Sequence, residues 1–102
     1  MGRSATKVFT QPADIARLEH WVAELAVNAR VRVHCGHSAP QEGVVTVTPT
    51  VQVFQDGDGN EGLNGIVKLE SAQRPDWDGA IWLGDITGIE HLDSVTFGSS
   101  KA

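Results

Sequence analysis

Hydrophobic residues recur at helical spacing near the start of the chain. The positions three and four residues apart, which place one apolar stripe on a helix, are Ile15, Leu18, Val22 and Leu25. Pro12 suits the first turn of this helix, where its missing N–H costs nothing, and Asn28 suits a left-handed residue after the end. We predict an amphipathic helix from about Thr10 to Val27.

From Arg30 onward the hydrophobic period changes from helical to two. Val31, Val33 and Cys35 alternate with polar residues, which is typical of a strand with one buried face. Further short strands are predicted at 43–48, 51–54, 65–70 and 81–89, and glycines or Pro49 stand at the breaks between them. At Gly84 the alternation slips by one residue, as expected where a strand bends. The pattern predicts one helix and about five bent strands in a small half-open barrel, since one flat sheet would leave long exposed edges.

The composition is that of one small soluble domain. The 102 residues are 40% hydrophobic and 21% charged, and no apolar run approaches the roughly 20 residues that span a bilayer. The first ten residues lack the apolar centre of a secretory signal, so we expect a cytoplasmic protein without membrane association. Cys35 is the single cysteine and is interpreted as a small buried hydrophobe. A net charge of −5 disfavours a broad basic face for nucleic acid.

The candidate metal and catalytic residues do not form a recognisable site. Asp56, Asp58 and Asn60 occupy positions one, three and five of a calcium loop, but Glu61 and Val67 stand where that loop needs glycine and a bidentate glutamate. The histidines lack zinc-ligand spacing, and there is no Ser-His-Asp arrangement or phosphate loop. We therefore expect no enzymatic activity, no catalytic residues, no metal and no cofactor.

Several stretches carry a resemblance to a known family. Val31-Arg32-Val33-His34-Cys35-Gly36, the strand begun by Gly43, and Leu83-Gly84-Asp85-Ile86-Thr87-Gly88-Ile89 resemble the two halves of the Sm signature. More narrowly, the segments 18–22, 49–52, 61–65 and 81–83 resemble a small, functionally uncharacterised bacterial family with a variant Sm-like (SH3-like barrel) fold. The resemblance covers about residues 8 to 92. It implies a mainly β fold with one N-terminal α-helix and a small, five-stranded, strongly bent antiparallel Sm-like barrel.

The resemblance also indicates where RNA would bind. Sm proteins that hold RNA use an aspartate and asparagine before the central strand and a basic residue before the glycine of the second motif, but Leu83 occupies that basic position here. Asn60 and Asn64 are alternative loop residues, and the register leaves both open. Trp82 is interpreted as a core or interface residue, with base stacking as the alternative. The candidate nucleic-acid-binding residues are Asn60, Asn64, Trp82, Gly84 and Asp85, with Arg30 and Arg32 as the close basic pair.

The sequence thus predicts a non-enzymatic Sm-like binding module that acts in protein interaction or self-assembly. A half-open barrel exposes a strand edge, so we expect a homo-oligomer, and a protein partner is the related possibility. A weak RNA-binding protein is the alternative, disfavoured by the acidic charge. The predicted division is a tail at 1–9, one domain at 10–92 and a second tail at 93–102, with a mobile loop from Asp56 to Asn64. The predicted core residues are Leu18, Val22, Val33, Val47, Val67, Leu83, Ile86 and Ile89.

Overall fold

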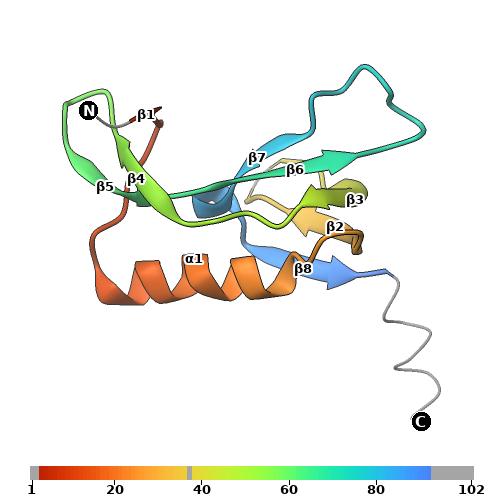
Figure 1. Cartoon of the computed structure of the whole chain (residues 1–102), viewed down its shortest axis with the longest axis horizontal. Helices are drawn as coiled ribbons and strands as arrows, with labels where there is room; N and C mark the ends of the chain where they lie inside the picture. Colours follow the sequence, from red (N-terminus) through yellow and green to blue (C-terminus); the bar gives the residue numbers. More distant parts are fainter. Residues whose placement is uncertain (1–2, 37, 93–102) are drawn as a thin grey trace, which may run out of the picture.

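The computed structural model describes residues 3–36 and 38–92 (Figure 1). One α-helix, one short 3-10 helix and eight strands follow one another within these residues. Their bounds are β1 (Arg3–Ser4), α1 (Pro12–Glu24), β2 (Arg30–His34), β3 (Gln41–Val47), β4 (Gln52–Gln55), β5 (Glu61–Asn64), β6 (Ile66–Glu70), β7 (Ala80–Trp82), η1 (Leu83–Asp85) and β8 (Gly88–His91).

The helix α1 forms where the hydrophobic stripe predicts it and is shorter than predicted at both ends. Pro12 opens it, Asp14 places a carboxylate in the first turn, and Leu25 caps its end. Asn28 adopts a left-handed φ of 71°, as predicted, but in the connection that follows the helix. Figure 1 shows α1 running along one face of the strands. The side chains that α1 and its cap bury against them are Leu18, Trp21 and Leu25.

The strands form two sheets. The larger sheet is antiparallel, with the order β7-β6-β3-β2-β8, and the smaller one has the order β1-β4-β5, in which β1 is parallel to β4. At Gly65 the chain passes from β5 into β6. A Cβ atom there would lie 2.7 Å from the Thr50 carbonyl oxygen and 2.7 Å from Leu83 Cδ1, so a larger residue does not fit. Gly65 therefore marks the place where one long strand divides between the two sheets.

The prediction of a five-stranded barrel is correct for the mainly β class and wrong for strand number and closure. Within residues 3–36 and 38–92 there are eight strands, and β7 and β8 remain the two edges of the five-stranded sheet. The chain leaves β7 through η1 and crosses to the opposite edge, where β8 pairs with β2 rather than with β7. The three additional strands are β1, which pairs with β4; β5, which precedes Gly65; and one from the predicted strand 81–89, which η1 divides into β7 and β8.

The hydrophobic core lies between α1 and the larger sheet. Five predicted core residues are fully buried: Leu18, Val33, Val67, Leu83 and Ile86. Val22 and Ile89 are partly buried and pack against this core. The prediction for Val47 is wrong, because its side chain is 70% exposed. The ladder between β3 and β6 shifts register between Val45 and Val47, so Val45 points inward and Val47 points outward.

The segments predicted as a tail and a mobile loop contain ordered structure. Phe9 forms a bridge with Leu63, and Ala5 is buried, so residues 3–9 lie against the smaller sheet. In the predicted loop 56–64 the last four residues form β5, so the loop prediction is wrong there. The predicted second tail at 93–102 lies outside the described residues. No helix within the described ranges has the length and apolar character needed to cross a bilayer.

Candidate functional site: an open strand edge beside a cleft

A cleft of about 620 Å³ runs along β7. All three β7 residues line it, together with η1 and the β2–β3 connection, whereas β6 contributes none of the described lining residues. The cleft therefore lies on the side of β7 that faces away from its ladder partner. This is the side at which the larger sheet does not close.

Backbone groups of β7 face this cleft. Gly79 O accepts a hydrogen bond from Leu69 N–H at 2.9 Å, and Leu83 N–H donates to Gly65 O at 2.8 Å. Along an antiparallel strand, alternate residues direct their N–H and C=O groups toward the same partner. Ile81 therefore bonds toward β6, and the backbone groups of Ala80 and Trp82 point the other way. The N–H of Ala80 fits this geometry, since it donates to Asp78 Oδ1 at 3.2 Å instead of to β6.

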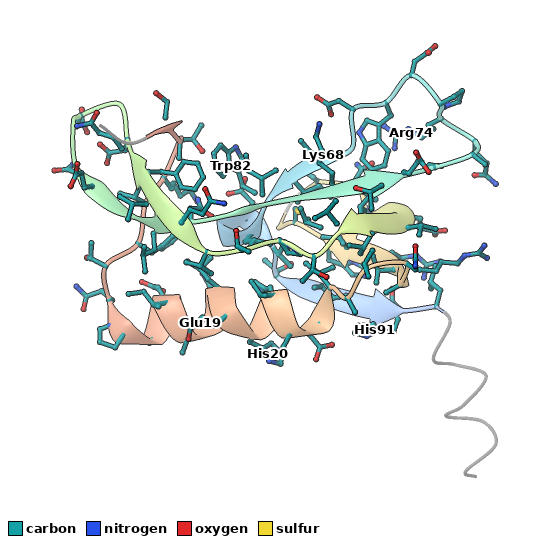
Figure 2. The ribbon with its side chains drawn as sticks, viewed as in Figure 1. Glu19, His20, Lys68, Arg74, Trp82 and His91 are labelled. Atoms are coloured by element: carbon teal, nitrogen blue, oxygen red, sulfur yellow. The ribbon has the colours of Figure 1, made fainter. Side chains whose placement is uncertain are left out.

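Two tryptophans provide apolar surface in the cleft. Trp82 is half-buried and meets Phe54 edge to face, with ring centroids 5.2 Å apart and an interplanar angle of 80°. Figure 2 shows Trp82 on the face of the sheet opposite α1. Trp77 packs against the core from the β6–β7 connection, and the guanidinium of Arg74 lies 4.2 Å from the centroid of its ring. The indoles are held by the fold, and both line the cleft.

Positive charge gathers around the same cleft. Lys7 and Arg17 line it, and Arg74 donates to the cleft residue Gln41 at 2.6 Å. The Lys7 ammonium lies 3.7 Å from Asp85 Oδ1 as an exposed, weak ion pair. Arg17 makes no ion pair or side-chain hydrogen bond with any residue of the described ranges. The cleft therefore combines indole rings with cations.

Cys35 also lines the cleft, and its chemistry is that of a small hydrophobe. Partial burial, followed by the negative charge of Asp85, raises the pKa of the Cys35 thiol above its ordinary value. The thiol therefore stays protonated near neutral pH and is a poor nucleophile. The neighbouring His34 points away from Cys35, with Nε2 placed 2.8 Å from Glu90 Oε1. In the part of the chain that the structure describes, no three His, Cys, Asp or Glu side chains gather as a metal site.

The candidate RNA residues fall into three separate places. Trp82, Gly84 and Asp85 line the cleft together. Asn64 lies beneath them with its side chain buried. Its Oδ1 accepts hydrogen bonds from Gly65 N–H at 2.8 Å and Gly84 N–H at 3.0 Å, and its Nδ2 donates to the Lys7 carbonyl at 3.0 Å. This amide is occupied by holding the backbone.

Asn60 lies in the turn between β4 and β5, and it does not line the cleft. Asp56 Oδ1 accepts hydrogen bonds from the backbone N–H groups of Asp58 and Asn60, both at 2.9 Å. These bonds, led by the one from the Asn60 N–H, lower the pKa of the Asp56 carboxyl. The residues that resemble the start of a calcium loop thus form a compact turn whose donors are satisfied internally.

Arg30 and Arg32 lie on β2, and neither lines the cleft. Arg32 is bound by two carboxylates, with Nη2 2.7 Å from Glu42 Oε2 and Nη1 3.1 Å from Glu90 Oε1. These contacts raise the pKa of the guanidinium. The cations that do line the cleft, Lys7 and Arg17, were missed from the sequence. Lys7 stands in the predicted tail, and Arg17 lies outside the apolar stripe that predicts α1.

Comparison with known proteins places the chain in a family. A model of the family described as "Domain of unknown function (DUF3247)" matches residues 2–92. The chain belongs to this family. A solved structure from Xanthomonas campestris, described as adopting a novel variant of the Sm-like motif, is similar at 33% sequence identity and a TM-score of 0.83, over 90% of this chain and 99% of that one. No curated protein matches the chain. The resemblance to an uncharacterised bacterial family with a variant Sm-like fold is confirmed.

Proposed function

We propose that this member of the family is a non-enzymatic binding module that acts in protein interaction or self-assembly, through the outward side of β7. The observation that carries the proposal is the direction of the Ala80 C=O and the Trp82 N–H, which point away from β6 toward the cleft. The Trp82 C=O belongs to the N-cap of η1 and is used there. Groups in this position are satisfied by a further strand, which adds to the sheet by main-chain hydrogen bonds.

The side chains beside this edge suit a protein interface. Trp82 lies opposite Ile66 in the β6–β7 ladder, and Ile66 is itself exposed. Aromatic anchors next to a groove contribute much of the binding free energy in protein complexes. A polypeptide strand on β7 would cover the Trp82 ring while it pairs with the Trp82 backbone.

The distribution of polar groups favours a polypeptide over RNA as the partner. The Asn64 amide is engaged by three backbone groups, and Arg32 is engaged by two carboxylates. An RNA site needs free polar groups for base edges as well as cations for phosphates, and the Asn64 amide is not free. Weak RNA binding with a shallow salt dependence therefore stays the alternative prediction.

Site-specific photo-crosslinking tests the proposal. A benzophenone amino acid is placed at the exposed Ala80 of β7, and a control carries it at Val53, which is 52% exposed on β4. Purified protein at high micromolar concentration and protein in bacterial lysate are irradiated, with and without ribonuclease. We expect polypeptide adducts at position 80 that survive ribonuclease and are much weaker at position 53. Adducts lost with ribonuclease, or the absence of adducts at position 80, would contradict the proposal.

A further inference from the structure

The charges around the cleft are opposite to those of the chain as a whole. The protein has eight Lys and Arg against thirteen Asp and Glu. Yet two cations, Lys7 and Arg17, line the cleft, against one carboxylate, Asp85, among its described lining residues. Just outside it, Arg74 bonds the lining residue Gln41 and Asp78 bonds the backbone N–H of the lining residue Ala80. A local positive field on an acidic protein favours an acidic partner over a basic or neutral one.

Two of these cations are available to a ligand. Arg17 has no partner among the described residues, and it is exposed. The Lys7 and Asp85 side chains are 62% and 42% exposed at a separation of 3.7 Å, so their pair is loose. Both cations can turn toward a carboxylate without losing a buried contact.

Trp82 and Arg17 lie on opposite sides of β7. Trp82 projects from the face of the sheet opposite α1, whereas Arg17 belongs to α1 (Figure 2). Successive side chains of a strand also point to opposite faces. A strand paired with β7 would therefore direct one set of side chains toward Trp82 and the alternate set toward Arg17.

We propose that the cleft takes an extended segment of another protein in which apolar and acidic residues alternate. The segment pairs with β7 through the Trp82 N–H and the Ala80 C=O. Its apolar side chains cover the indole, and its carboxylates meet Arg17 and Lys7. This inference rests on the proposed function and names its partner class. The cleft, at about 620 Å³, has room for the few residues that a three-residue strand can pair with.

Two synthetic peptides of equal length test the charge rule. One is the capped heptapeptide Glu-Val-Glu-Val-Glu-Val-Glu, and the other has lysine in place of every glutamate. Their binding to the wild-type chain, to Arg17→Glu and to Arg30→Glu is measured by fluorescence anisotropy. Arg30 is the matched control because the substitution changes the net charge equally and Arg30 does not line the cleft. Circular dichroism checks that each variant is folded.

We expect the wild-type chain to bind the acidic peptide at least about tenfold more tightly than the basic one. Arg17→Glu should lose about tenfold for the acidic peptide and gain for the basic one, and Arg30→Glu should behave as wild type. Equal binding to wild type and Arg17→Glu, preference for the basic peptide, or no binding of the acidic peptide would overturn the inference. The inference would also be overturned if an oligouridine probe, and not the acidic peptide, bound the wild-type chain and lost affinity in Arg17→Glu.

The crosslinking experiment separates the two levels of the argument. Polypeptide adducts at position 80, together with failure of the acidic peptide, would overturn the partner class and leave the proposed function standing. If those adducts join two copies of this chain and the acidic peptide does not compete, the occupant of the cleft is a second copy. If no polypeptide adducts form at position 80 and the acidic peptide does not bind, the inference and the proposed function are overturned together.

Discussion

Asn64 Oδ1 accepts a hydrogen bond from the backbone N–H of Gly84 at 3.0 Å, and this contact joins the end of β5 to η1. The same side chain, which is 1% exposed, also bonds Gly65 and the carbonyl of Lys7. One amide therefore connects the β5–β6 junction to the segments of Lys7 and Gly84, which line the cleft. The position of the Trp82 edge depends on this connection.

Replacing Asn64 should destabilise the fold. Asn64→Ala removes the partners of two backbone N–H groups and one carbonyl, and an unsatisfied buried group costs about 1–3 kcal/mol. Urea unfolding should show a loss of at least this size for Asn64→Ala. Asn60→Ala, which removes an exposed turn side chain, is the control and should cost less. Equal small losses for both variants would show that Asn64 does not hold the segments together.

The core and the exposed bulge should respond differently to truncation. Leu83 is fully buried, so Leu83→Ala should cost about 2–5 kcal/mol in the free energy of unfolding. Val47 is 70% exposed beyond the register shift, so Val47→Ala should be within about 0.5 kcal/mol of wild type. Chemical denaturation of the two variants measures both values. A large loss for Val47→Ala would mean that the register of β3 is different.

The Glu90 carboxyl should titrate below its ordinary range. Hydrogen bonds from His34 first and Arg32 second lower the pKa of Glu90. Between the ordinary pKa and this lower value the folded chain keeps the carboxylate ionised while the unfolded chain binds a proton, so this contribution to stability is lost as the pH falls. NMR titration of the Glu90 carboxyl carbon should show its pKa rising toward the ordinary value in His34→Ala. An unchanged Glu90 pKa in that variant would rule out His34 as the main cause.

Self-association should be detectable in solution. We expect a dimer or a higher homo-oligomer at high micromolar concentration in sedimentation experiments, because β7 and β8 are sheet edges. Ala80→Glu places a charge on the β7 edge opposite Lys68 and should weaken association, whereas Val53→Glu on the smaller sheet should not. A wild-type chain that sediments only as a monomer would remove homo-oligomerisation and leave a different protein as the partner.

Much of the fold could be predicted from the sequence because its periodicity is local information. The stripe that contains Leu18 predicts α1, and the alternation at Val31 and Val33 predicts β2. The position of Val47 could not be predicted, since a bulge reverses which face a residue occupies and leaves the alternation in the sequence unchanged. Closure of the barrel could not be predicted either, because it depends on which strands pair over long sequence separations.

The candidate site could be predicted only in part, for the same physical reason. Trp82, Gly84 and Asp85 are neighbours in the sequence, and they line one cleft. Arg17 and Lys7 reach the cleft through the packing of α1 and the path of residues 3–9, and nothing in their local sequence indicates it. Asn64 was predicted as a candidate nucleic-acid-binding residue, but it is buried beneath η1 because the chain changes sheets at Gly65.

Residue-resolved amide hydrogen exchange tests the central claim, that the outward side of β7 binds a polypeptide strand. The N–H of Leu83 donates to Gly65 O and serves as the internal reference, whereas the N–H of Trp82 faces the cleft. In dilute protein we predict rapid exchange at Trp82 and slow exchange at Leu83. When polypeptide is bound, as a second copy at high concentration or as the Glu-Val peptide, exchange at Trp82 should slow at least about tenfold while Leu83 stays slow. A Trp82 amide that is already protected in dilute protein, or that exchanges equally fast with polypeptide bound, would contradict the account.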